Sequence, residues 1–483
     1  MEIRRRYQRC LGTRAVVGRE ASGASMTRLA GRNFAATRIA TSLFVATFLF
    51  SIPRAAHAVP SYARQTSLAC EACHTVFPQL TPFGRAFKAS GYTLFNTLKV
   101  SDVNRLKQST LSLSDLPPIS VMVMASTSQE EKANDGQSSK SSTDFPQQFS
   151  IFYAGRISDN LGAYIQATYD DQSGTFGMDN TDVRFADVAS YDGHSVIYGV
   201  SLNNNPTVQD LWNSTPAWSQ PFISSPAMQG PNAAPQIEGA LAQAVAGLSA
   251  YTYIDQSIYA EVGVYRSALQ GASVAFNGNT NNNVISGVAP YWRLAYENDW
   301  GKNSWELGTF GLEASLENPT TPAGNGINQS LKNALTDRFL DAGLDTQYQY
   351  IDDETQITVT GRWTHEHENL NASFPATFAD NMTDNLDYVS VVGSYFWHRK
   401  LGATLGLFNL SGSTDATYFG TANGQPNSTW GNVEVDYLPW LNVKLGLQYT
   451  AYFTFNGATS NYDGAGRNAK DNNMLFAYLW LAF

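Results

Sequence analysis

Met474-Leu475-Phe476-Ala477-Tyr478-Leu479-Trp480-Leu481-Ala482-Phe483 ends the chain and predicts its fold more clearly than any other stretch. Successive side chains of a β-strand point to opposite faces, so Leu475, Leu479 and Phe483 would share one apolar face. The other face carries Met474, Phe476, Tyr478, Trp480 and Ala482, which is unusually apolar for a surface that borders water. We expect a lipid-facing strand whose inner side packs against other apolar groups.

The same alternation recurs upstream in segments of about ten residues, which is the weak sequence signal of a membrane β-barrel. Leu441, Val443, Leu445, Leu447 and Tyr449, for example, alternate with Asn442, Lys444, Gly446, Gln448 and Thr450. Sixteen such segments begin near residues 119, 147, 161, 181, 194, 239, 257, 288, 303, 338, 355, 385, 401, 429, 441 and 472. A soluble β-sandwich would also alternate, so the connections carry the argument.

The predicted connections alternate between short and long. Short ones include Asp159-Asn160, Asp192-Gly193 and Arg399-Lys400, and the long ones fall near 128–146, 172–180, 205–238, 268–287, 318–337, 370–384, 415–428 and 457–471. Outer-membrane barrels have short periplasmic turns and long external loops, and an even strand number puts both termini in the periplasm. The terminal Phe483 also resembles the signal that the outer-membrane assembly machinery reads. We predict an all-β fold, an antiparallel outer-membrane β-barrel of about 16 strands with a small N-terminal segment.

Composition agrees with this fold and excludes others. The 483 residues are 43% hydrophobic and only 15% charged, against roughly 25% charged in soluble domains. The one long apolar run, Ile39 to Ile52, is shorter than the ~20 residues of a membrane-spanning helix. A helical membrane protein is therefore excluded.

The first 58 residues predict export. Arg28, Arg32 and Arg38 precede the apolar run and Ala56-His57-Ala58 follows it, the order of a secretory signal with cleavage after Ala58. Met26 is the expected true start. We divide the chain into a presequence (1–58), a haem segment (59–115) and the barrel (116–483). Loss of the presequence removes ten Arg and two Glu, and the acidic remainder would repel nucleic acid and attract metal cations.

Cys70-Glu71-Ala72-Cys73-His74 is the clearest chemical motif in the chain. In C-x-x-C-H two thiols form thioethers to haem and the adjacent His ligates the iron. A disulfide or a chance pentapeptide is the alternative. Cys10 leaves with the presequence, so the exported chain has no other thiol. We expect one covalent haem c on Cys70 and Cys73, with His74 as the proximal ligand.

The flanks of this motif carry a resemblance. Pro60-Ser61-Tyr62-Ala63-Arg64-Gln65-Thr66 precedes it, and Phe77-Pro78-Gln79-Leu80-Thr81-Pro82-Phe83-Gly84-Arg85-Ala86-Phe87-Lys88 and Gly91-Tyr92 follow it. Over about thirty residues the segment resembles the monohaem cytochrome-porin fusions of bacterial outer membranes, the family of the iron-oxidising outer-membrane cytochromes. It departs at Ser67, where the family usually has Gly, and at Ala89, where it often has Leu. The resemblance implies a haem held in a barrel and Fe(II) as one electron donor, although other family members leave the donor open.

Side chains near the motif could serve the haem. Phe77, Phe83, Phe87 and Tyr92 could pack the porphyrin, and Arg64, Arg85 and Lys88 could pair with its propionates. Ordinary core packing of the aromatic residues and a solvated surface for the cations are the alternatives. So short a segment should need the barrel to cover its haem.

The second axial ligand is not supplied by the motif, because neither Met nor another His lies between His74 and Leu116. Strand parity turns Met122 and Met124 inward, beside the inner face of the last strand, and His398 near a periplasmic turn is the rival. Met ligation would raise the haem potential, but inward Met residues are more often packing. Water or an open site is the remaining alternative.

Other features leave alternatives open. His365 and His367 share the parity of Val359 and Trp363, which favours a surface role over a metal site. The Pro-rich stretch 206–235 could fold inward or stand outside. Acidic residues near the external rim could concentrate cations or simply solubilise loops: Glu130, Glu131, Asp135, Asp170, Asp171, Asp380 and Asp384.

Two functions compete. The first is an electron conduit from an extracellular reductant, Fe(II) by resemblance, through haem to a periplasmic cytochrome or copper protein. With one haem and a hydrocarbon layer of ~30 Å, the haem segment should lie inside the lumen or at its mouth. The second is a diffusion porin in which the haem segment is a plug or redox gate. Peroxide or oxygen chemistry has little support.

Overall fold

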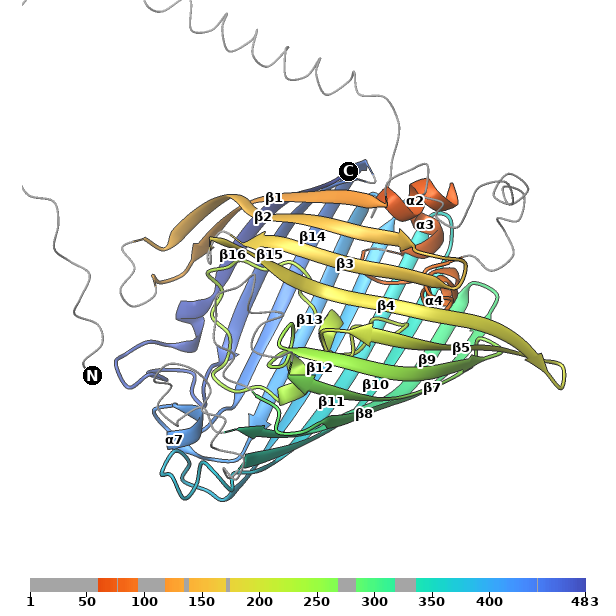
Figure 1. Ribbon diagram of the computed structural model, residues 1–483. Coiled ribbons are helices and arrows are strands. Elements are labelled where there is room, and N and C mark those ends of the chain that lie inside the picture. Colours follow the sequence, from red (N-terminus) through yellow and green to blue (C-terminus); the bar gives the residue numbers. More distant parts are fainter. Residues whose placement is uncertain are drawn as a thin grey trace, which may run out of the picture. The chain divides into compact units, whose positions relative to one another are not determined.

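A closed barrel of sixteen antiparallel strands forms the body of the protein (Figure 1). The computed structural model describes residues 60–75, 77–93, 118–133, 139–170, 174–267, 284–317, 336–440 and 442–483. The expected signal peptide and its cleavage site, and Leu441 at the start of one expected strand, lie outside these residues. The predicted fold class is confirmed.

Every strand pairs with its neighbours in sequence, and the first pairs with the last. The strands are β1 (Ile119–Glu130), β2 (Ser141–Arg156), β3 (Leu161–Asp170), β4 (Thr175–Tyr191), β5 (His194–Asn203), β6 (Val245–Ile254), β7 (Ile258–Ser267), β8 (Ala289–Trp300), β9 (Asn303–Glu317), β10 (Thr336–Ile351), β11 (Thr355–Asn369), β12 (Thr383–Trp397), β13 (Leu401–Gly412), β14 (Ser428–Trp440), β15 (Val443–Thr454) and β16 (Met474–Ala482). No sheet edge remains open, because β1 closes on β16.

Three expected connections differ from the structure. The stretch 128–146 contains the end of β1 and the first six residues of β2, which pair with each other there. The stretch 172–180 is mostly strand, because β4 begins at Thr175 and pairs with β3 beyond the expected loop. The strand expected near residue 239 begins at Val245, since Gly239 has a φ of 122° and starts a turn. The remaining strands begin within about two residues of their predicted starts.

The two faces of the wall differ as the alternation predicts. On β13, Leu401, Leu405 and Leu407 are exposed on the outside, while Thr404 and Phe408 are buried inside. Exposed aromatic residues such as Trp300 and Trp397 lie at strand ends, as in the aromatic girdles of outer-membrane barrels. The wall is therefore suited to a lipid environment. No helix among the described residues is long and apolar enough to cross a bilayer.

The N-terminal segment folds into three short helices, α2 (Pro60–Thr66), α3 (Cys70–Cys73) and α4 (Pro82–Ala89). It binds the wall near the short turns: Ser61 Oγ donates to Ala154 O at 2.7 Å, and Tyr251 OH donates to Ala89 O at 2.6 Å (Figure 1). Glycine permits the closest approach, because a Cβ on Gly162 of β3 would lie 2.2 Å from Gly91 O. The segment thus lies at the end of the barrel that carries the short turns.

Residues 204–244, between β5 and β6, fold into the lumen. Trp212 in this inward loop is fully buried and packs at right angles to Tyr253 and Tyr259 of the wall. The short helix η2 (Gln236–Glu238) ends the loop on the inner face of β10 and β11. Of the two placements left open by the sequence, the structure has the inward one.

Candidate functional site

The C-x-x-C-H motif is one tight turn. Cys70–Cys73 forms α3, and His74 ends it in an extended conformation, with His74 N donating to Cys70 O at 2.9 Å. His74 then forms a bridge with Leu80, which folds the chain back on the motif. Both thiols and the imidazole are therefore presented by five consecutive residues.

The residues that follow the motif fix this turn in place. Thr81 caps α4 by accepting from Gly84 N at 3.1 Å, and its own hydroxyl donates to Ala72 O at 2.6 Å. Gly84 lets α4 lie against α3, because a Cβ there would be 2.2 Å from Cys73 O. The Thr-Pro-Phe-Gly sequence after the motif therefore packs α4 against the motif.

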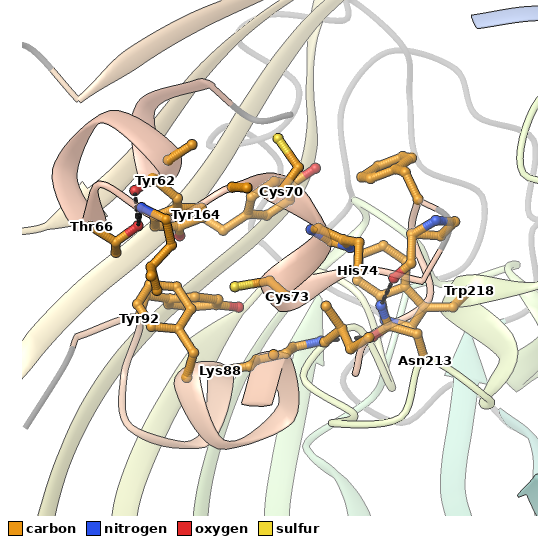
Figure 2. Close-up of a pocket in the computed structure, with 18 of the residues that line it drawn as sticks. Tyr62, Thr66, Cys70, Cys73, His74, Lys88, Tyr92, Tyr164, Asn213 and Trp218 are labelled. Carbon is orange, nitrogen blue, oxygen red and sulfur yellow. Dashed lines mark hydrogen bonds between the residues drawn. The ribbon is translucent and has the colours of Figure 1, made fainter. Parts of the chain in front are cut away.

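Cys70, Cys73 and His74 line one cavity of about 830 Å³ (Figure 2). Three of the four aromatic residues expected near haem, Phe77, Phe87 and Tyr92, border it. The remaining walls come from Tyr62 and Leu68 of the segment, Tyr164 of β3, and Val208, Asn213 and Trp218 of the inward loop. Phe83 is not part of this lining and is 42% exposed.

The His74 ring is oriented for metal ligation. Its Nδ1 lies 3.3 Å from Gln79 O, and a donor hydrogen bond there leaves Nε2 as the free nitrogen. Burial lowers the pKa of His74 to about 4, so the imidazole is neutral at physiological pH. Burial also raises the pKa of Cys73 to about 11 and keeps it a thiol. Two thiols and a neutral, oriented imidazole on one apolar cavity are a donor set that fits haem c.

A second cavity, of about 790 Å³, touches the other side of the motif. Cys70, His74 and Phe77 border both cavities. Its far wall includes Phe396, Glu434, Lys444 and Trp480 of the barrel. The Phe77 and Trp480 rings stack with centroids 6.0 Å apart, so the segment covers part of the apolar inner face of β16.

Arg85 binds the barrel wall. Its fully buried guanidinium donates to Gln349 Oε1 at 2.8 Å, to Ser304 Oγ at 2.6 Å and to Glu297. The propionate role expected for Arg85 would require these bonds to break. Arg64 is half-buried, donates to Ile119 O and is not part of the cavity lining.

Lys88 joins α4 to the inward loop. Its Nζ donates to Val208 O at 2.9 Å, to Asp210 O and to Asn213 Oδ1 at 3.0 Å, and it lies 4.8 Å from the centre of the Trp218 ring. Asn213 Nδ2 donates in return to Pro78 O at 2.7 Å. The segment and the loop thus form one joint plug, and the donors of Lys88 are already engaged.

The candidate distal ligands lie outside the cavity lining. Met122 and Met124 are buried and face inward as expected, but they pack in a cluster with Phe476, Tyr478 and Trp480. His398 is exposed in the turn after β12, with its ring 4.5 Å from that of Trp397, and so does not point inward. Among the described residues that line the cavity, none is a Met or a second His.

The other predicted surface groups divide in two. His365 pairs with Asp387 and His367 with Asn385 on the outer face, in agreement with a surface role. Of the acidic rim residues, Glu131 and Asp380 are exposed, Asp170 is half-buried, and Glu130 and Asp384 are buried. Asp135 and Asp171 lie outside the described residues.

Sequence reasoning missed the charged network that holds the inward loop. Arg293 of β8 lies between Asp210 of the loop, Glu306 of β9 and Asp345 of β10, with Nη2 at 3.0 Å from Asp210 Oδ1 and 3.1 Å from Glu306 Oε1. All four side chains are buried. The available signal in the sequence was strand parity, which predicts that the Arg293 side chain points into the barrel.

Comparison with known proteins adds little beyond the fold. No protein-family model matches the chain, and no curated protein matches it. Among solved structures, the chain is similar to OmpF of Salmonella typhi (TM-score 0.45, 10% identity, covering 76% of this chain and 97% of that one). It is also similar to the anion-selective porin of Comamonas acidovorans (0.42, 13%, 76% and 98%) and to OmpT of Vibrio cholerae (0.41, 11%, 76% and 96%).

Proposed function

We propose that this protein is an outer-membrane cytochrome, a porin-like barrel that carries one haem c on Cys70 and Cys73 with His74 as its proximal ligand. It moves electrons between an extracellular donor, Fe(II) by family resemblance, and a periplasmic electron carrier. The observation that carries the proposal is that both thiols and the oriented imidazole border one apolar cavity, whose other walls include residues of the barrel wall and the inward loop.

The chain's own residues prepare the site. Haem would supply one-electron redox chemistry there. Gln79 O orients His74, and Gly84 and Thr81 hold the two-cysteine turn against α4. Phe77, Phe87 and Tyr92 give the site apolar walls, and low polarity around a haem is one determinant of its potential. Arg85 and Lys88 fix the segment to the wall and to the loop.

The position of the segment supports transfer to a periplasmic partner. It binds at the short-turn end of the wall, and short turns are periplasmic in outer-membrane barrels. A carrier in the periplasm could approach this end. Reduction from outside requires that the donor enter from the long-loop end.

Covalent attachment is tested with the Cys70→Ser, Cys73→Ser double variant on haem-stained gels. Staining should disappear while heat-modifiable migration still reports a folded barrel. Normal staining of the double variant would refute the attachment site. His74→Ala should shift the Soret band, and an unchanged spectrum would exclude His74 as a ligand.

The donor is tested by stopped-flow mixing of the purified ferric protein with Fe(II) at several pH values. Reduction of the haem at one or more of them is the expected result. If Fe(II) does not reduce the haem at any pH, iron is not the electron donor and another reductant must be.

A gated diffusion porin is the second candidate, favoured by the porin-like barrel itself and by the loop folded into its lumen. Planar-bilayer conductance separates the two. The intact protein should conduct poorly, because the joint plug fills the lumen. A large open conductance in the intact protein would contradict the conduit and favour the porin.

A further inference from the structure

An ion pair joins the cysteine motif to the barrel. Glu71 lies between Cys70 and Cys73 in the chain, and its Oε1 is 3.1 Å from Arg399 Nη1. Arg399 belongs to the short turn between β12 and β13. The side chains are only partly exposed, 25% for Arg399 and 38% for Glu71. The barrel therefore supplies a cation to the motif itself.

Arg399 also binds the wall behind the motif. Its Nε donates to the side-chain oxygen of Gln356 at 3.0 Å, and the side-chain nitrogen of Gln356 donates to Thr75 O at 2.6 Å. Gln356 is a buried residue of β11, and Thr75 follows His74 in the chain. Thr75 N donates to Gln79 O at 3.2 Å, the same oxygen that orients the His74 ring. A chain of hydrogen bonds thus connects the turn to the imidazole.

The backbone of the turn indicates that Arg399 is placed there for its side chain. His398 and Arg399 have φ angles of 48° and 58°, in the left-handed region that a type I′ hairpin turn requires. Asn, Asp and Gly adopt this region most readily, and Asp192 and Gly193 do so in the turn between β4 and β5. A long cationic side chain at such a position is held by its contacts rather than by turn preference.

The ion pair faces the second cavity. Glu71, Thr75 and Arg399 line this cavity together with Cys70 and His74. Apolar side chains of the barrel and of the inward loop form other parts of its wall. Charges in such partly buried surroundings are screened less than charges in water. Both members of the pair can therefore act electrostatically on the motif.

Lys444 is the other cation that lines this cavity within the described part of the chain. Its Nζ lies 2.9 Å from Glu434 Oε1 and 3.1 Å from Asp436 Oδ1 on the wall. These two carboxylates of β14 hold Lys444, so the cation bound to the motif is Arg399.

We propose that Arg399 is a positioning residue that, through its ion pair with Glu71, sets the reduction potential of the haem on this motif. The inference rests on the proposed function, because it concerns the haem on Cys70 and Cys73. A cation near a haem favours the ferrous state, which carries less positive charge, and a carboxylate favours the ferric state. Arg399 and Glu71 therefore act in opposite directions and largely cancel.

Spectroelectrochemical titration of the full chain in detergent, at neutral pH and low salt, tests this. Arg399→Met should lower the potential, because Glu71 loses its counter-charge, and Glu71→Gln should raise it. Each change should alter the ratio of ferrous to ferric haem at a fixed ambient potential by about three- to tenfold, and tenfold is 59 mV for a one-electron couple. The double variant should return close to the wild-type potential, and both single shifts should shrink at high salt.

Two further variants separate charge from packing. Arg399→Lys keeps the charge but loses the bond to Gln356, and it should restore most of the wild-type potential. Lys400→Met removes an exposed cation of the same turn that forms no ion pair among the described residues, and it should shift the potential far less than Arg399→Met does. Heat-modifiable migration reports the folding of each variant. If Arg399→Met does not fold, Glu71→Gln and Arg399→Lys still carry the test.

Shifts in the same direction in Arg399→Met and Glu71→Gln would overturn the proposal, because lost packing rather than charge would then be the cause. Wild-type potentials in both variants would overturn it as well. Haem staining separates these results from a failure of the proposed function, since a wild-type protein without covalent haem would refute that function before any potential is measured.

Discussion

At the scale of single residues, Gly84 ties the helix after the motif to the motif itself. In Gly84→Ala the new Cβ would meet the main-chain oxygen of Cys73 at 2.2 Å. The backbone cannot yield as a flexible side chain can, so α4 must move, at a cost of about 1–3 kcal/mol. We expect clearly reduced haem staining in a barrel that still folds. Gly393→Ala is the matched control, because a Cβ at Gly393 meets nothing within 4 Å, and equal staining of both variants would contradict the prediction.

Lys88 gives the joint plug a pH dependence. Burial, and then the charge of Arg184, lowers its pKa from 10.5 to about 7. Between these values the released Lys88 binds the proton, whereas the docked Lys88 is a neutral amine whose two N–H groups serve two of its three acceptors. Docking therefore becomes more favourable as the pH rises from 7 to 10.5. The slope is at most about 1.4 kcal/mol per pH unit. Hydrogen exchange of the α4 amides, corrected for intrinsic rates, measures this opening free energy.

In Lys88→Met the hydrogen bonds to Val208 and Asn213 are lost, and with them this titration. The opening free energy of α4 should then be nearly independent of pH in the same window. The same slope in the variant and the wild type would show that another group is responsible.

At the scale of elements, alternation located the strands because one face of each must suit lipid. The alternation gave wrong strand boundaries where a segment does not need a lipid-facing side. The start of β4, from Thr175 to Asp182, is largely polar and resembles a loop, yet it is a strand because β3 pairs with it. The stretch after Gly239 resembles a strand, but Leu241 is buried by the inward loop as part of a turn.

The candidate site divides in the same way. The motif and the packing glycine are local, and the sequence showed the motif. The partners of Arg85 are 212 to 264 residues away on the wall, and those of Lys88 are 120 to 125 residues away in the loop. Only closure of the barrel brings these groups together. The sequence could suggest haem propionates as partners of Arg85, but it could not show that Glu297 of the wall is its partner.

The inward loop should depend on Arg293. Arg293→Met leaves Asp210, Glu306 and Asp345 buried without their cation, and loss of one partner from a buried ion pair costs about 3–5 kcal/mol. We expect the loop to leave the lumen and single-channel conductance to rise. Arg338→Met, which removes a half-exposed outer ion pair with Glu313, should conduct as the wild type does. Wild-type conductance in Arg293→Met would show that other contacts hold the loop.

At the scale of the whole molecule, the barrel has two chemically different ends. The cysteine motif and its apolar cavity lie by the short turns, and four buried carboxylates, Asp341, Glu366, Glu368 and Asp384, lie towards the long loops. Under the proposed function, one haem would not span a hydrocarbon layer of ~30 Å as a relay. An extracellular donor would then have to approach the haem from the long-loop end of the barrel.

Closure of the barrel depends on the last residue. Phe483 N donates to Val121 O at 2.9 Å and Val121 N donates to Phe483 O at 2.8 Å, so this pair completes the seam between β1 and β16. Deletion of Phe483 removes both bonds and an exposed outer ring, and leaves Val121 at the start of the seam unpaired with β16. We expect a markedly smaller heat-modifiable fraction in membranes. Phe453→Ala, which removes a similarly exposed outer ring from β15 but no seam bond, should fold almost as the wild type does. If the deletion folds as well as Phe453→Ala, the seam closes without its last residue and the terminal Phe serves another purpose.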